Sequence, residues 1–172
     1  MRSIAMPGPE IVGEAGDSPV GRLEVGVSAL VRWMGGRPIQ DRVGASAGVD
    51  LPAASVGLLE HLEVAGPMRV SDIAACHQVD TSTATVRIQG LQRDGLVVRT
   101  PDPADRRVSM IAISVRGRDA VARLRAARRA LLADLFAEVD AAEIEQVAAL
   151  LRRVEQRMID AAHGSAVPAP SP

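Results

Sequence analysis

The polar face expected for residues 81–94 has side chains of the types that can form hydrogen bonds in the major groove of double-stranded DNA. Hydroxyl groups open the segment, and an arginine and a glutamine follow. In the major groove, hydroxyls contact phosphates and bases, while arginine and glutamine bind guanine and adenine through paired hydrogen bonds. Val86 is expected on the same outward face. The residues expected to contact DNA are Thr81, Ser82, Thr83, Thr85, Arg87 and Gln89.

The proline-rich loop 101–107 carries further charged side chains: Asp102, Asp105, Arg106 and Arg107. An arginine at the thin tip of a hairpin can enter the narrow, electronegative minor groove. An aspartate beside it can fix that arginine through a charged hydrogen bond. We therefore add Asp105, Arg106 and Arg107 to the expected DNA contacts, the alternative being a solvated polar loop.

These side chains need elements that present a helix and a loop together. The sequence pattern predicts a short helix over 71–77, a turn at 78–80, a helix over 81–94, and strands over 96–100 and 108–113. This order is a helix-turn-helix followed by a wing. The same helical spacing also occurs in small clusters within larger helical proteins. The expected caps are Ser71, then Asp80 or Thr81, with Gly95 as a left-handed stop.

Two helices are expected before the winged part. Apolar residues at helical spacing predict helices over about 19–34 and 51–65. Asp17 or Ser18 is expected to cap the first, and Asp50 the second. Residues 37–50 show no clear pattern.

Two helices are also expected after the winged part. Ser114 is predicted to cap a helix over about 115–138, and a last helix runs to about Ala161. The last helix has an apolar seam typical of helix packing, formed by Ile144, Val147, Leu151, Val154 and Met158. The fold class is therefore mainly α with a small β-hairpin wing. We expect one domain over 19–163, with disordered tails at 1–18 and 164–172.

Charge and composition narrow the function classes. The chain has 172 residues, one cysteine and a net charge of -1, and all 20 of its basic residues are arginine. The middle segment 81–129 holds 11 arginines against 4 acidic residues, whereas both flanks are acidic. A local basic region attracts anions whatever the total charge. Lacking an export signal, an apolar run of membrane length or a cysteine pair, the chain is expected in the cytoplasm.

Residues 51–117 resemble the MarR family of winged-helix regulators. The resemblance is carried by Gly66-Pro67, Val70-Ser71-Asp72-Ile73-Ala74, Thr81-Ser82-Thr83-Ala84-Thr85, Leu91, Gly95-Leu96-Val97, Arg99, the wing 102–107 and Ile113-Ser114-Val115-Arg116-Gly117. The most specific piece is the Asp-x-Arg wing signature at Asp105 and Arg107. The resemblance adds Arg99 to the expected DNA contacts. It implies a homodimer joined through helices near 19–34 and 115–161, a pseudo-palindromic operator, and repression relieved by a small ligand or by thiol oxidation.

The sequence departs from this family at the second helix of the helix-turn-helix. The family often carries a basic residue where this chain has Val86, and arginine comes one position later at Arg87. Arg87 either reaches DNA from a shifted angle or packs its stem against the core. The connection over 35–50 is also longer than is usual in the family, so the shape of the ligand crevice is expected to differ.

The single cysteine and the three histidines are the other side chains that could react or bind a metal. Cys76 is expected to be a small buried side chain rather than a redox sensor. His61, His77 and His163 do not have metal-ligand spacing, and no cofactor or metal is expected.

The arginines at 125–129 are expected on a solvated face, and the roles of Arg116 and Arg118 stay open. Trp33 and Met34 are candidate ligand-binding residues, because the family's crevice lies near the end of the first helix.

The pattern contains no nucleophile–base pair, phosphate loop or dinucleotide motif, so an enzyme is not expected. The sequence favours a homodimeric repressor that binds double-stranded DNA and is released by a small effector. The alternative is a dimeric winged-helix module for protein–protein contact without specific DNA binding. The near-neutral total charge supports that alternative.

Overall fold

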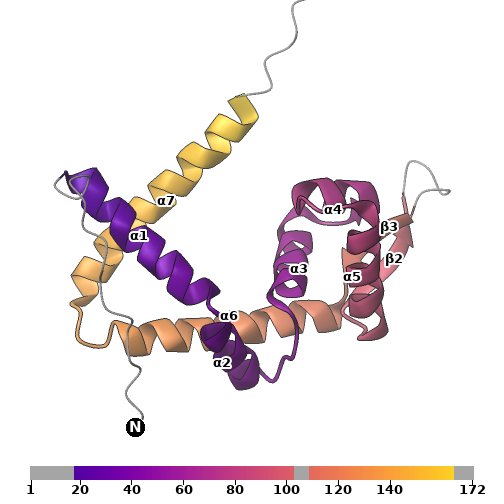
Figure 1. The fold of residues 1–172 in the computed structure, drawn as a ribbon, viewed down its shortest axis with the longest axis horizontal. Coiled ribbons are helices and arrows are strands. Elements are labelled where there is room, and N and C mark those ends of the chain that lie inside the picture. The colour runs from indigo at the N-terminus through magenta and orange to yellow at the C-terminus, as the bar shows by residue number, and fades with distance from the viewer. Residues whose placement is uncertain (1–17, 103–108, 165–172) are drawn as a thin grey trace, which may run out of the picture. The chain divides into compact units, whose positions relative to one another are not determined.

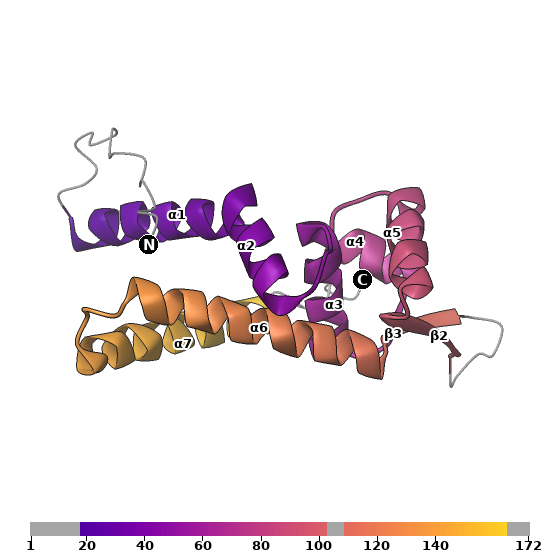
Figure 2. The same ribbon diagram turned by 90° about the horizontal axis from the view of Figure 1, so that it is seen from below.

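The computed structural model of the chain describes residues 18–102 and 109–164. The chain forms two compact units, and the first ends at Arg129 within the long helix α6. The wing residues Asp105, Arg106 and Arg107 lie outside the described residues. So do the expected tails, apart from Ser18 and Gly164. The elements are α1 (Pro19–Gly35), α2 (Arg37–Ala47), α3 (Ala53–Ala65), β1 (Met68–Arg69), α4 (Val70–Cys76), α5 (Thr81–Arg93), β2 (Val97–Pro101), β3 (Ser109–Ile113), α6 (Val115–Leu135) and α7 (Ala141–Gly164), drawn in Figures 1 and 2.

The core of the first unit joins α3, α4, α5, the strands and the start of α6. Leucines of α3 are fully buried, and they meet isoleucines from α4, α5 and β3. Each large aliphatic side chain removed from water contributes about 1.5–3 kcal/mol. This cluster therefore holds the helix-turn-helix against the sheet. Its fully buried large side chains are Leu58, Leu59, Leu62, Ile73, Ile88, Leu91, Val97, Ile111 and Val121.

The sheet has three antiparallel strands in the order β1-β3-β2. Val97 pairs with Ile113 and Pro101 with Ser109, so the predicted hairpin of the wing is present. The unexpected strand is β1, in which Met68 pairs with Ile111. Two residues are too short to produce a periodic pattern, so only the pairing with β3 defines this strand.

Local caps fix the ends of α5 as predicted. The carboxylate of Asp80 accepts a hydrogen bond of 2.8 Å from the backbone N–H of Thr83 at the start of the helix. At the other end the chain turns through Gly95, whose φ of 71° is left-handed. Glycine takes this conformation without the steric cost that a Cβ imposes. Helix α5 therefore begins and ends at positions set by its own sequence.

Ser114 links the end of α5 to the start of α6. Its hydroxyl donates to the carbonyl of Gly95 at 2.7 Å and accepts from the N–H of Gly117 at 2.9 Å. Its backbone N–H donates to the carbonyl of Leu96 at 3.0 Å. Three hydrogen bonds on Ser114 thus join the turn at Gly95 and Leu96, between α5 and β2, to the start of α6, and the predicted cap is confirmed.

The segment left without an element in the sequence analysis forms α2. Its start carries Pro38 among the first helical positions, where a missing N–H costs nothing. Ile39, Val43 and Ala47 bury one face of this helix. The sequence signals were misleading because Gly36 and Pro38 also mark turns.

Two predicted caps are wrong. Pro52 precedes α3 with no side-chain cap, so Asp50 does not cap this helix. Arg69 precedes α4, which places Ser71 inside its first turn, with its hydroxyl 3.2 Å from the carboxylate of Asp72. In both places the chain enters the helix from an extended residue that makes no capping hydrogen bond with its side chain.

Candidate nucleic-acid interface

The helix α5 presents one face away from the core. Ala84, Ile88 and Leu91 are buried on its inner side. Residues spaced by three or four positions share a face of a helix, so the opposite face is formed by 82, 86, 89 and 93. The exposed side chains on it are Ser82, Val86, Gln89 and Arg93. The sequence analysis found Ser82 and Gln89 but missed Arg93, which this spacing identifies once the buried face is known.

The hydroxyls at the start of α5 are already engaged within the helix. Ser82 donates to Asp80, and Thr83 donates to the second carboxylate oxygen at 2.7 Å. Thr85 donates to the carbonyl of Thr81 at 2.7 Å. Each hydroxyl has one hydrogen, so in this arrangement these three groups offer only lone pairs outward. Their matching partners in the major groove are the amino groups of adenine and cytosine.

Asp80 is held in its charged form by these contacts. The side-chain hydrogen bond from Ser82, followed by those from Thr83, places the pKa of Asp80 well below its usual range. A carboxylate that accepts several hydrogen bonds is stabilised as the anion. The start of α5 therefore carries a negative charge.

Arg87 lies on the flank of α5 rather than at the centre of its outward face. Its side chain is half-buried, and its charge acts on His77 at the end of α4. The two expectations for Arg87 in the sequence analysis were a shifted approach to DNA and packing of its stem. The half-buried flank position is compatible with both.

His77 forms a side-chain pair with His61 of α3. The Nδ1 atom of His61 lies 3.3 Å from the Nε2 atom of His77, and the ring centroids are 5.2 Å apart. Burial, then the neighbouring His61, then Arg87 lower the pKa of His77 below its ordinary 6.5. Sequence spacing did not reveal this pair because it joins two different helices.

This pair predicts a loss of stability in acid. The folded state disfavours protonated His77, so its contribution is fully present above the ordinary pKa and is lost as the pH falls toward the lowered pKa. We expect the free energy of unfolding to fall between about pH 7.5 and about pH 5.5, and to fall less in His77→Gln. Urea unfolding of both proteins measures the difference. An identical pH dependence would contradict the prediction.

An ion pair at the base of the wing was not foreseen. The Nη2 atom of Arg69 on β1 lies 2.9 Å from Oδ2 of Asp102, which is 7% exposed. This ion pair to β1 fixes Asp102, the residue that directly follows β2. Arg99 on β2 is exposed, and its Nε donates to Gln92 at 3.4 Å.

The arginines of α6 divide between two roles. Arg125 pairs with Glu63 at 2.5 Å and Arg128 with Glu60 at 3.0 Å, so these two link α6 to α3 and are not a plain solvated face. Arg118 donates to the carbonyl of Ile113 at 3.1 Å, and Arg116 is exposed in the first turn of α6. The expectation for 125–129 is wrong in this respect because acidic partners on α3 are distant in sequence.

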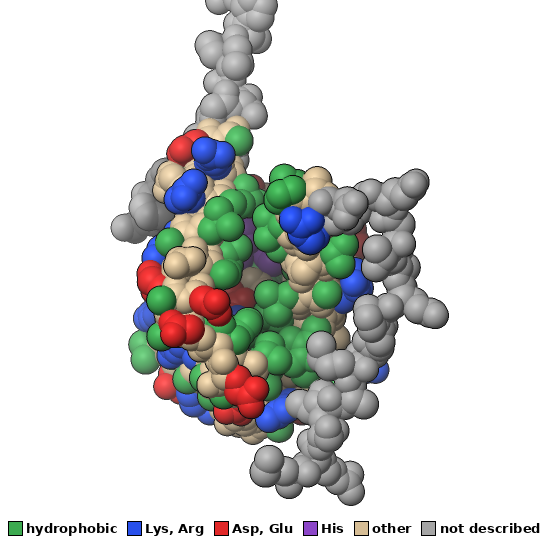
Figure 3. Space-filling model, turned by 90° about the vertical axis from the view of Figure 1, so that its left-hand side faces the viewer, with side chains coloured by type: hydrophobic (Ala, Val, Ile, Leu, Met, Phe, Trp, Pro, Cys, Tyr) green, Lys and Arg blue, Asp and Glu red, His purple; other side chains and the backbone are tan. Residues whose placement is uncertain are grey.

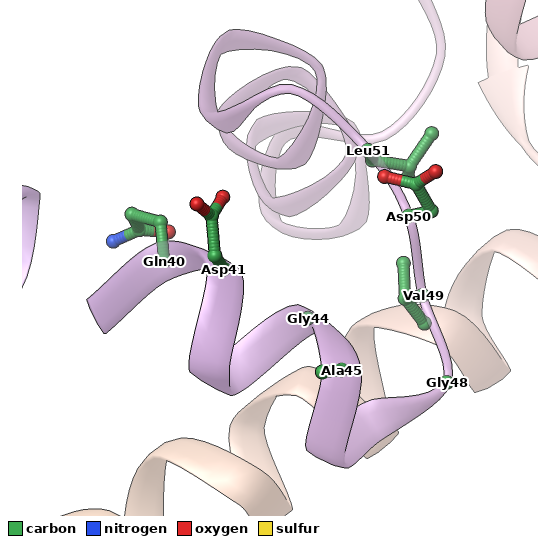
Figure 4. A pocket seen from close by; sticks show the side chains of 8 residues that line it. All are labelled: Gln40, Asp41, Gly44, Ala45, Gly48, Val49, Asp50 and Leu51. Carbon is green, nitrogen blue, oxygen red and sulfur yellow. The ribbon is translucent and has the colours of Figure 1, made fainter. Parts of the chain in front are cut away.

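A cavity of about 410 Å³ lies beside α2 (Figure 4). Asp41 on α2 and Asp50 on the connection to α3 lie on opposite sides of it. Trp33 and Met34 are half-buried and do not line it. Gln40 connects the cavity to the end of α1. Its side chain lines the cavity, and its amide donates to the Met34 carbonyl at 2.6 Å.

The remaining expectations concern the thiol of Cys76, a metal site and a membrane span. Cys76 is exposed at the end of α4, so the expectation of a buried side chain is wrong. Only Ile73 and Ala74 of that helix enter the core. Among residues 18–102 and 109–164, no three metal-ligating side chains gather. In the same part of the chain, no helix has the length and apolar character to cross a bilayer.

Comparison with known proteins agrees with this architecture. A model of the MarR family matches residues 49–108. An uncharacterized HTH-type transcriptional regulator of Bacillus subtilis, YxaD, is 30% identical over 111 residues, which are 64% of this chain and 78% of that protein.

Solved structures share the fold. The transcriptional regulator Tm0710 from Thermotoga maritima has a TM-score of 0.63 at 22% identity, covering 84% of this chain and 97% of that one. A MarR family protein from Bacillus stearothermophilus has a TM-score of 0.63 at 21% identity, covering 80% and 96%. The helix-turn-helix, the three-stranded sheet with its hairpin wing and the matched sequence together place the chain in the MarR family of winged-helix transcriptional regulators.

Proposed function

We propose that the protein is a homodimeric repressor that binds a pseudo-palindromic operator and is released by a small ligand. The observation that carries this proposal is the outward face of α5, where Ser82, Gln89 and Arg93 are exposed opposite the buried stripe. A helix held on a compact core in this way fits the major groove. As a partner of chromosomal DNA, the protein is proposed to act in the cytoplasm.

The proposed contacts fall into three groups. Gln89 binds adenine, and Arg93 binds a guanine or a phosphate beyond it. Thr81, Ser82, Thr83, Thr85 and Arg87 contribute from the start and flank of α5. The wing contributes Arg99, Asp105, Arg106 and Arg107, of which the last three lie outside the described residues. Residues 51–117 would form the DNA-binding part of one domain over 19–163.

The proposed dimer uses helices that bury little of their apolar surface. α1 has no buried residue, although Val20, Leu23 and Val27 repeat at helical spacing. On α7 the five residues of the predicted seam are each at least 40% exposed. Hydrophobic side chains are also visible among charged ones on the face drawn in Figure 3. An apolar stripe of this length is typical of a helix that packs against a partner.

The proposed ligand binds near the junction of α1 and α2. Trp33 and Met34 end α1, and Gln40 connects Met34 to the cavity beside α2. A ligand changes DNA binding only if it binds the two states of the protein unequally. Displacement of Gln40 from the Met34 carbonyl would give the two states different contacts.

The first test is fluorescence anisotropy with a labelled duplex from the region upstream of the protein's own coding sequence. We expect tight binding that weakens steeply as salt rises, because phosphate neutralisation releases counterions. A scrambled duplex of equal length is the control. Equal, salt-insensitive binding to both duplexes would support the protein–protein module instead.

Arg107→Ala tests the wing separately from base reading. We expect affinity to fall similarly on all duplexes, and the slope of log affinity against log salt to shrink by about 1, as for one lost phosphate contact. Anisotropy at several salt concentrations measures both. Arg153→Ala, at an exposed position of α7, removes the same charge and is expected to leave the slope unchanged. An unchanged slope in Arg107→Ala would contradict this role of the wing.

A further inference from the structure

Val86 is the exposed apolar residue at the centre of the outward face of α5. Its side chain is 68% exposed, and it lies one turn from Ser82 and one turn from Gln89. The other large aliphatic side chains of α5, Ile88 and Leu91, are buried. Val86 therefore contributes nothing to the core of the described unit.

A valine at such a position is unfavourable for the free protein. β-branched residues form helices less readily than alanine, and exposure gives no packing gain in return. The branch also restricts the side chain to few orientations, so its two methyl groups point in a fixed direction. That rigidity suits a contact with a partner of defined shape.

We propose that Val86 reads the C5-methyl group of a thymine in the major groove. Among the four bases, thymine alone presents a methyl group there. Against guanine, cytosine or adenine, valine would cover a polar edge without a hydrogen bond, which is costly. This inference rests on the proposed function, because it requires α5 to enter the groove.

The neighbours of Val86 define the setting of this contact. Gln89 lies three positions further along the same face and suits adenine, while Ser82 offers lone pairs on the other side. An apolar contact between two polar ones excludes water from the thymine methyl group. The specificity determined by Val86 is thus thymine over cytosine at one position of each half-site.

The experiment first selects preferred duplexes from a random library with the full-length protein. Each thymine of the selected duplex is then replaced by deoxyuridine, which removes only the methyl group. We expect one thymine per half-site at which replacement weakens binding about fourfold, the equivalent of about 0.8 kcal/mol for one methyl group. Replacement in both half-sites is expected to weaken binding ~16-fold by the same measure.

Two variants assign the effect to its side chain. In Val86→Ala the thymine and deoxyuridine duplexes are expected to bind equally, and the variant retains its fold because alanine is the better helix former. Val64→Ala, at an 83% exposed position of α3, is the matched control and keeps the full difference. A flat deoxyuridine scan, or a difference that persists in Val86→Ala, would overturn the inference while leaving the proposed function intact. If no duplex is enriched, the proposed function fails and the inference fails with it.

Discussion

The double variant Leu151→Glu/Val154→Glu is expected to be monomeric and to bind a two-half-site duplex about 100-fold more weakly than the parent protein. The two side chains lie in the apolar seam of α7 and are 52% and 44% exposed. A carboxylate buried at an apolar interface loses its hydration without gaining a partner. Linked binding of two heads raises affinity by about 10²–10⁴ over one head, and a monomer loses this gain.

Sedimentation velocity measures the mass of this variant, and anisotropy measures its DNA affinity. The control is Arg153→Glu, an exposed position on the opposite face of α7 that changes the net charge by the same amount. It is expected to remain dimeric. Circular dichroism is expected to show equal helix content in all three proteins, because the seam residues are not part of the core. A double variant that sediments as a dimer would remove α7 from the proposed interface.

Gly117→Ala is expected to lower the free energy of unfolding by about 3 kcal/mol. A Cβ atom at Gly117 would lie 2.1 Å from the carbonyl oxygen of Leu96 and 2.8 Å from Cγ1 of Ile113. No rotamer relieves a clash with a backbone oxygen, so the start of α6 must move. That movement breaks the hydrogen bonds that Ser114 makes to Gly95 and Leu96 in the turn between α5 and β2.

Thermal unfolding checks this expectation, with a melting temperature about 6–12 °C lower for a chain of this size. The matched control is Gly57→Ala on α3, where a Cβ would meet nothing within 4 Å. A glycine inside a helix costs about 0.5–1 kcal/mol relative to alanine, so this control is expected to be more stable than the parent. Equal stability of the two variants would contradict the close packing at Gly117.

Local hydrogen bonds explain which parts of the fold were predictable. Ser18, Asp80 and Ser114 cap their helices through backbone N–H groups three positions further along the chain, and such contacts are visible in the sequence. Gly95 ends α5 for an equally local reason. The helix-turn-helix and the wing followed from these signals together with hydrophobic periodicity.

Contacts between distant segments explain what was missed. The partners Arg69 and Asp102 are 33 positions apart, and Glu60 and Arg128 are 68 apart. No spacing rule connects them before the fold is known. The outward face of α5 was only partly predictable for the same reason, because the buried stripe of the helix defines which side faces out. Val86 and Arg93 lie at the centre of that face, whereas Arg87 lies on its flank.

The anionic cap of α5 has a consequence for the DNA complex proposed above. The exposed N–H groups at the start of a helix, with the positive end of its dipole, commonly form an anchoring point for a phosphate. Here the carboxylate of Asp80 occupies that place and accepts the N–H of Thr83. A phosphate brought to the same point would meet a negative charge. In the proposed complex we therefore expect the start of α5 to avoid the sugar–phosphate backbone. The middle of α5 would then enter the groove, and arginines elsewhere would contact the phosphates.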